Sequence, residues 1–282
     1  MLSLSRRGFL LTPAFLYAQG QLTARAVVER IQKNVGVSWR ENTVDVFKAG
    51  DPETPVKGIA TSFAGTFDVL KRASAAGKNL VIVHEPTFYN HLDETKDLAG
   101  EVFKEKQDFI AANKVVVWRF HDHWHARRPD GILTGMVESL GWDKYHSGER
   151  ANYFILPAAT LNDLARSVRD RMGIKTIRVI GDPQIKVSRV VLNPGFNNLP
   201  GVMRALERPE VDVLVIGESR EWEGIEFARD VASSGRRKGL IVMGHVPSEE
   251  NGMKECARWL KTFISEVPIE FVPSGEPFWQ PK

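Results

Sequence analysis

Cysteine is almost absent from this sequence, which carries Cys256 alone among 282 residues. A single cysteine excludes an internal disulfide framework and any cysteine-rich zinc site. Cys256 shares a helical spacing with the apolar residues Met253, Leu260 and Phe263, so we interpret it as a buried packing residue. A metal ion bound by this chain must therefore be held by histidine and carboxylate side chains.

An excess of charge of one sign is also lacking. The formal net charge is +3, and the basic residues are not gathered in one block. Nucleic-acid binding depends on a basic surface, so the sequence gives it no electrostatic support. No second long apolar run follows the N-terminal region, so we expect the protein to be free of the membrane once that region is removed.

The N-terminal region has the pattern of an export signal. Residues 5–11 read Ser-Arg-Arg-Gly-Phe-Leu-Leu and lead into a short apolar stretch that ends near Ala18. The pair Arg6-Arg7 resembles the twin-arginine signal, which is read by a receptor and does not anchor the protein. A buried N-terminal helix is the alternative, and Pro13 in its middle disfavours it. We expect a signal peptide over residues 1–18 and a periplasmic or secreted mature protein.

Apolar runs of Val, Ile and Leu alternate with amphipathic helical patterns along the rest of the chain. Near-continuous apolar runs are typical of strands covered on both faces, and the alternation predicts α/β layering. We predict two α/β lobes with mixed sheets, the first from residues 20–126 plus 240–282 and the second from 127–239. The predicted strands are 56–63, 80–83, 115–120, 153–156, 177–180, 187–192, 211–216, 240–243 and 269–272, and the predicted helices are 67–76, 161–172 and 249–267.

Histidines and carboxylates follow several of these strands. His84 and Glu85 come at the end of one strand, and His245 precedes Glu249 by four residues at the start of the last helix. The ends of strands are where α/β proteins assemble their sites. For the first pair, a capping histidine beside a solvated Glu is a reasonable alternative. For the second pair, an acidic first helical turn explains Glu249 but not His245.

A third group, His-Asp-His-Trp-His, occupies residues 121–125. In an extended chain His121, His123 and His125 would lie on one face and form a metal-binding surface, with Asp122 on the other. A polar edge strand is the alternative, and three histidines in five residues make it the weaker one.

These motifs together resemble one family. The segment from Val56-Lys57-Gly58-Ile59 to Thr66, the histidine at 84, the 121–125 group, Gly217-Glu218 and the final Gly244-His245 with Glu249 are similar to the dinuclear-metal-centre family named for NGG-interacting factor three. Its bacterial members are often named type 2 GTP cyclohydrolase homologues. The resemblance covers roughly residues 22–278. It implies two α/β lobes, a homo-oligomer in the form of a hexameric ring, and two divalent ions between the lobes.

The resemblance also implies a set of metal ligands, which we carry over as His84, Glu85, His125, His245 and Glu249. The sequence departs from the family at two of them, because Glu85 stands in place of a histidine and His125 in place of an aspartate. The total of three imidazoles and two carboxylates is unchanged, as expected if the charge of the ions must still be neutralised. If His125 lies elsewhere, His121 or His123 takes its place. His121 and Glu218 are candidates for outer contacts, and Ala64 stands where the family has a further aspartate.

A metal-dependent hydrolase acting on a small molecule is the function that this set predicts, with two ions of Zn, Mn or Fe as cofactors. Glu218 and Asp122 are alternative general bases. GTP is disfavoured as a substrate, because no glycine-rich loop that would cradle phosphates is present. The alternatives are a non-catalytic metal-binding scaffold that assembles as a ring, and a structural protein with incidental histidines.

The export signal leads to a direct prediction. Replacing Arg6 and Arg7 with Lys should leave the full-length precursor in the cytoplasm, because the twin-arginine receptor reads that pair. Cell fractionation and mass measurement of the chain would test this, and unchanged export of the variant would contradict it.

Overall fold

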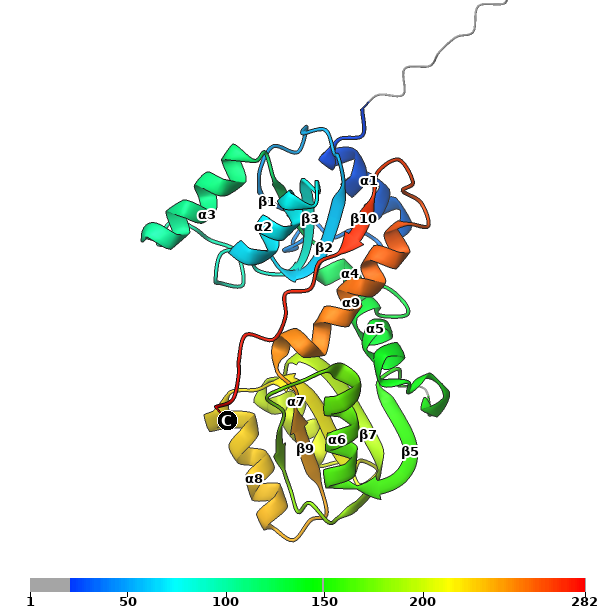
Figure 1. Ribbon diagram of the computed structural model, residues 1–282. Helices are drawn as coiled ribbons and strands as arrows, with labels where there is room; N and C mark the ends of the chain where they lie inside the picture. The colour runs from blue at the N-terminus through cyan, green and yellow to red at the C-terminus, as the bar shows by residue number, and fades with distance from the viewer. Residues whose placement is uncertain (1–20, 149, 282) are drawn as a thin grey trace, which may run out of the picture.

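The computed structural model of the protein describes residues 21–148 and 150–281, so the expected signal peptide over residues 1–18 lies outside the described residues. Two lobes, each built around a five-stranded sheet, lie one above the other, with the helices α5 (Gly131–Leu140) and α9 (His245–Leu260) between them (Figure 1). The prediction of an α/β fold with two mixed sheets is confirmed.

The first sheet has the strand order β1-β4-β3-β2-β10. Its four strands from β4 to β10 run parallel, and the edge strand β1 is antiparallel to β4. Its strands are β1 (Phe47–Ala49), β2 (Ile59–Ala64), β3 (Leu80–Glu85), β4 (Val116–Arg119) and β10 (Ile269–Phe271). The helices of this part of the chain are α1 (Ala24–Asn34), α2 (Phe67–Ala75), α3 (Glu101–Ala112) and the short α4 (Asp122–Ala126).

The second sheet has the order β5-β7-β8-β9-β6, with three parallel central strands and two antiparallel edges. Its strands are β5 (Tyr153–Thr160), β6 (Arg178–Ile180), β7 (Lys186–Phe196), β8 (Val213–Glu218) and β9 (Gly239–Val242). Its helices are α6 (Leu161–Met172), α7 (Leu199–Leu206) and α8 (Glu226–Ser233), with shorter turns η1 (Asp143–Tyr145) and η2 (Glu221–Ile225). Residue 240, where the first lobe was expected to resume, lies in β9 and so belongs to this second sheet. The chain returns to the first sheet through α9, which begins at His245.

Both faces of each sheet are buried, as the apolar runs predicted. In β3, Leu80 and Ile82 pack toward α1 and α9, while Val81 and Val83 pack toward α2 and α3. Successive side chains of a strand point to opposite faces, so a continuous apolar run fills two cores at once. Cys256 is fully buried on the core side of α9, as expected.

Close backbone contact fixes α5 against α9. A Cβ atom at Gly135 would lie 2.2 Å from the carbonyl oxygen of Asn251, and one at Gly252 would lie 2.5 Å from Cα of Ile132. Only glycine permits this approach. The start of α9, which carries two of the candidate ligands, is thereby held in a fixed place relative to α5 and α4.

Two sequence expectations need correction. The last helix begins at His245, not near Glu249, and ends at Leu260, not at residue 267. Pro247 falls in its first turn, where the missing N–H has no helical partner to lose, so Glu249 lies one turn after His245 on the same face. The strand β1 was not predicted, because its three residues are too few to show a period. No helix in the two described ranges combines the length and apolar character needed to cross a membrane.

Candidate metal centre

The candidate site lies where the carboxyl ends of parallel strands from both sheets meet. His84 and Glu85 end β3, and Glu218 ends β8. His245 and Glu249 lie on the first two turns of α9, which follows β9. In parallel sheets this edge is where ligand sites form. The structure thus brings together the strand ends that the sequence analysis singled out.

The 121–125 group is helical, which corrects the expectation of an extended chain. Residues Asp122–Ala126 form α4, and the buried carboxylate of Asp45 accepts hydrogen bonds from the backbone N–H groups of His121, Asp122 and His123 at 2.6–2.9 Å. A carboxylate at the start of a helix accepts from the free N–H groups of the first turn and interacts favourably with the helix dipole. Asp45 is nearly eighty residues earlier in the sequence, which is why local pattern missed this cap.

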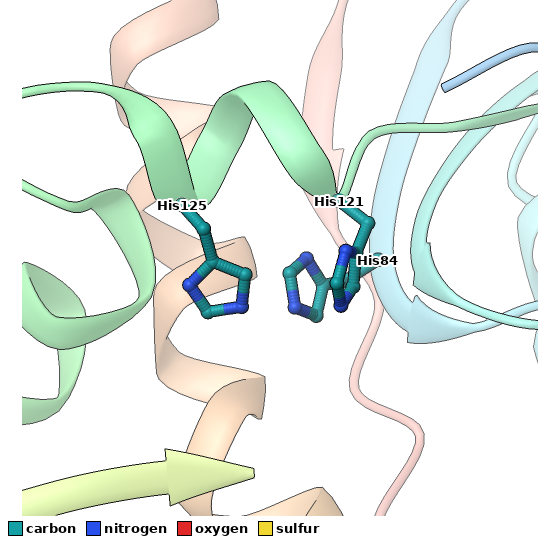
Figure 2. Close-up of side chains that lie close together, drawn as sticks. All are labelled: His84, His121 and His125. Carbon is teal, nitrogen blue, oxygen red and sulfur yellow. The ribbon is translucent and has the colours of Figure 1, made fainter. Parts of the chain in front are cut away.

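The helix separates the three histidines. His121 and His125, four residues apart, share one face and point toward His84 (Figure 2). His123 points the other way and is fully buried: its ring stacks on Trp39 at 3.6 Å between centroids. Its Nδ1 lies 2.7 Å from a carboxylate oxygen of Asp45, and its Nε2 accepts from the N–H of Arg40. His123 is therefore a structural residue.

Imidazole Nε2 atoms converge on two carboxylates. The Nε2 atoms of His84 and His245 lie 3.5 Å and 3.2 Å from Oε2 of Glu249, and that of His125 lies 4.0 Å from its Oε1. The candidate ligand atoms form two overlapping groups, within each of which all atoms lie within 4.8 Å of one another. One group is His84, His121 and His125, and the other is His84, Glu85 and Glu249.

His121 belongs to this inner set together with His125, although the sequence suggested it only as an outer contact or as a substitute for His125. Its Nε2 lies 3.5 Å from Oε1 of Glu85, the same oxygen that lies 3.5 Å from Nε2 of His245. The structure therefore places four imidazoles and two carboxylates around one space. The helical i, i+4 spacing of His121 and His125 is the signal that could have identified both.

Each of the four rings is oriented through its other nitrogen. Nδ1 of His84 lies 3.1 Å from the carbonyl oxygen of Phe120, and Nδ1 of His245 lies 3.1 Å from Oε1 of Glu218. An Nδ1–H that donates to an oxygen fixes the tautomer and leaves the lone pair on Nε2.

The two rings of α4 follow the same rule. Nδ1 of His121 lies 2.9 Å from Oδ1 of Asp122, and Nδ1 of His125 lies 3.0 Å from Oδ2 of Asp130. Oriented imidazoles backed by carboxylate or carbonyl oxygens are the usual surroundings of metal-binding histidines. All four rings thus present the nitrogen that a metal would use toward the same space.

The carboxylates are held as firmly as the rings. The buried guanidinium of Arg119 donates to Oε2 of Glu85 at 3.0 Å and to the carbonyl of His84, which turns the other oxygen of Glu85 inward. Gly195 makes room for Glu249, because a Cβ atom there would lie 2.1 Å from Oε1 of Glu249. Neither Arg119 nor Gly195 was identified from the sequence.

Burial sets the charge state of His84. Its side chain has no exposed area, and burial is the main reason that its pKa is lowered well below the usual range, with the nearby His121 and His125 lowering it further. His84 is therefore neutral at physiological pH, and the hydrogen bond at its Nδ1 places the lone pair on Nε2.

His245 has the opposite tendency. Burial lowers its pKa, but the hydrogen bond with Glu218 and the close carboxylates of Glu249 and Glu85 outweigh burial and raise the pKa to about 12. Three carboxylates around one imidazole strongly favour a positive charge at this position. In a chain without an ion a proton on His245 supplies that charge, and a bound divalent ion would displace the proton.

A cation fits this donor set. Nε2 of His84 and Oε2 of Glu249 are both buried, have no hydrogen-bond partner among the described residues, and face each other at 3.5 Å. Two buried lone pairs that face each other are unfavourable unless a positive charge lies between them. Mixed imidazole and carboxylate donors are those of Zn, Mn and Fe sites. The residues present therefore fit a divalent metal centre.

The two candidate bases differ in their surroundings. Asp122 accepts from the hydroxyl of Thr43 and the N–H of Val44 and orients His121. Burial raises its pKa, but these hydrogen bonds outweigh it and lower the pKa to about 2. Glu218 bonds only Nδ1 of His245 through one oxygen, and 46% of its side chain is exposed. Ala64, at the end of β2, is buried beside Glu85 in the sheet register and offers no carboxylate.

These observations define a class of protein: it has two α/β lobes, and oriented imidazoles and carboxylates lie at the ends of its strands. The chain belongs to the Duf34/NIF3 (NGG1p interacting factor 3) family, which matches residues 23–277. The resemblance identified from the sequence is thereby confirmed.

Three similar proteins share the fold or the sequence of this chain at low identity. A protein named "GTP cyclohydrolase 1 type 2 homolog" from Chlamydia pneumoniae is 23% identical over 243 residues, which are 82% of this chain and 89% of that one. Protein SA1388 of Staphylococcus aureus has a similar structure, with a TM-score of 0.72 at 15% identity over 92% of this chain and 99% of that one. A Bacillus cereus protein related to NIF3 gives 0.71 at 13% identity over 91% and 98%. These structural matches establish the fold.

The contrasting surroundings of His121 and His123 give a paired prediction. His121→Ala should weaken binding of zinc at least tenfold, because even changes beyond the ligands cost that much, and should leave the stability of the metal-free chain nearly unchanged. His123→Ala should lower the free energy of unfolding by about 1–3 kcal/mol, because it removes the ring that bonds the buried Asp45 carboxylate and leaves the N–H of Arg40 without its acceptor.

Competition with a chromophoric chelator would measure the affinity, and urea unfolding of chelator-treated protein would measure stability. The assignment of the two histidines is contradicted if the zinc affinity falls more in His123→Ala than in His121→Ala.

Proposed function

We propose that this protein is a metal-dependent hydrolase with a dinuclear divalent centre. The observation that carries the proposal is the convergence of four imidazole Nε2 atoms and two carboxylates on one space, with each Nδ1 already bonded to an oxygen. The residues that would hold the ions are His84, Glu85, His121, His125, His245 and Glu249.

The number of donors favours two ions. A single zinc in a structural or catalytic site takes three or four protein ligands, and six side chains reach this space. Five carboxylates contact the four imidazoles. Arg119 pairs with Glu85 and Arg40 lies 4.0 Å from Asp122, so in the described part of the chain three of the five have no Lys or Arg partner. This surplus of negative charge suits two divalent ions of Zn, Mn or Fe better than one.

Hydrolysis is the chemistry that such a centre supplies, because divalent ions polarise the bond to be cleaved and lower the pKa of water. The chain itself would provide the proton acceptor. Glu218 fits this role better than Asp122, because it has a partly exposed carboxylate at the border of a cavity of about 700 Å³ that His245 and Pro247 also line. Asp122 acts instead as a positioning residue for His121.

The substrate is a small molecule in this proposal. The names of the relatives refer to GTP, so GTP belongs in any test of substrates, although the sequence has no glycine-rich phosphate loop. The expected export signal, where present, would deliver the protein to the periplasm or beyond, where nucleoside triphosphates are scarce. Esters, amides and phosphoesters are therefore the first classes to test.

A non-catalytic scaffold that assembles as a ring, with a hexamer as the expected form, is the second candidate. Three large aromatic side chains favour it, because Trp222, Phe278 and Trp279 are 75%, 67% and 76% exposed. Exposed aromatic residues are enriched where protein surfaces meet.

Glu218→Gln separates the two candidates. The variant keeps an oxygen that can accept from His245, so metal content measured by elemental analysis should stay within a few-fold of the wild type. Its hydrolytic rate at saturating zinc, on the best substrate of an ester, amide, phosphoester and GTP panel, should fall about 10²–10⁴-fold, because it cannot accept a proton.

Glu221→Gln is the matched control, since Glu221 borders the same cavity, is 73% exposed and pairs with Arg178. Its rate should be unchanged. A metal-loaded wild type that hydrolyses no member of the panel would favour the scaffold, and hydrolysis that survives complete removal of metal would contradict the proposed mechanism.

A further inference from the structure

A cavity of about 460 Å³ adjoins the candidate metal centre on the side of the first lobe. Glu85 and His245 belong to both, and the ring of Phe63 lies edge-on against His245 with centroids 5.4 Å apart. A cavity of this size can enclose a small organic molecule. Because Glu85 and His245 line it, a molecule bound there can present one end to the metal centre.

The walls of this cavity are aromatic and apolar. Phe63, Phe67 and Tyr89 line it together with Ala64 and Pro86. Polar side chains complete the lining, namely Thr66, Thr87, Asn90, His91 and Lys106. An apolar lining favours the burial of an apolar ligand, and aromatic walls favour a planar ring further, through edge-to-face and offset-stacked contacts.

Tyr89 is held at this cavity under backbone strain. Its φ is 67°, a left-handed conformation that a bulky residue rarely adopts, and its side chain is 63% exposed. The surrounding loop compensates, because Asp93 accepts from the N–H groups of Thr87 and Phe88 at 2.6 and 2.7 Å, and Asn90 donates to the carbonyl of Phe88. Strain that persists because neighbouring bonds enforce it is typical of ligand-binding loops.

A buried cation supports the same ring. Lys106 is 1% exposed, donates to the carbonyl of Thr87, and has its ammonium 5.0 Å from the centroid of Tyr89. This cation–π contact stabilises the ring in place. An exposed tyrosine ordered in this way loses little entropy when a ligand packs against it.

We propose that this cavity is the substrate-binding pocket and that it selects a substrate with an aromatic ring, packed against Phe63, Phe67 and Tyr89, whose reactive group reaches the metal centre. The proposal rests on the proposed function, because it places the reactive group by reference to that centre. Tyr89 and Phe67 are its specificity-determining residues.

Hydroxamic acids of matched shape test the pocket, because the hydroxamate group binds divalent ions while the rest of the molecule varies. Isothermal titration calorimetry of zinc-loaded full-length mature protein would compare benzohydroxamic, cyclohexanecarbohydroxamic and acetohydroxamic acids. We expect the benzo compound to bind about 3–10-fold more tightly than the cyclohexane compound, which has similar apolar area but no π-system, and more tightly still than the aceto compound.

Tyr89→Leu and Phe67→Leu should each reduce the preference for the benzo over the cyclohexane compound to twofold or less, with the affinity for acetohydroxamic acid unchanged. Trp279→Leu is the control, since Trp279 is an exposed aromatic residue outside the cavity lining, and it should keep the full preference.

The outcomes separate the two proposals. Equal binding of the benzo and cyclohexane compounds by wild-type protein, or a preference that survives both substitutions, would overturn the aromatic pocket and leave the metal centre standing. Failure of all three compounds to bind, with no zinc found by elemental analysis, would overturn the proposed function and the pocket with it.

Discussion

The constraint on which the site depends is the burial of acceptor atoms that face one another. Nε2 of His84 and Oε2 of Glu249 are both buried and 3.5 Å apart, and neither has a hydrogen-bond partner in the part of the chain that the structure describes. Burial keeps His84 neutral, so this contact gains nothing from a proton on that ring, and leaving such groups unpaired costs about 1–3 kcal/mol each. A divalent ion between them would accept both lone pairs and remove this cost. The carboxylates around His245 likewise favour a positive charge at the site.

Both sheets contribute side chains to this group of buried acceptor atoms. Parallel strands deliver His84 and Glu85 from the first sheet and Glu218 from the second to facing edges, and α9 carries Glu249 across from one to the other. Asp45 completes the arrangement by capping α4, which turns His121 and His125 toward the same space. Rigid packing of backbone against backbone between α5 and α9 then limits how far these donors can relax apart.

Strand positions were predictable because their signal is local: long Val, Ile and Leu runs are typical of strands that are buried on both faces of a parallel sheet. The site was predictable in part, since His84, Glu85 and the spacing of His245 and Glu249 are visible at strand ends. The structure of residues 121–125 was not, because the cap that makes them helical comes from Asp45, far away in the sequence. For the same reason His121 was not among the five expected ligands. The contact of Arg119 with Glu85 was not predicted either, because it also joins residues far apart in the sequence.

Anomalous diffraction from crystals of zinc-loaded, untagged protein tests the central claim most directly. Data collected at the zinc edge should show two peaks about 3.5–4 Å apart, each within about 2.0–2.3 Å of imidazole Nε2 or carboxylate oxygen atoms of His84, Glu85, His121, His125, His245 and Glu249. A single peak there would contradict the dinuclear centre. No peak among these side chains, with zinc in the crystal, would contradict the metal site altogether.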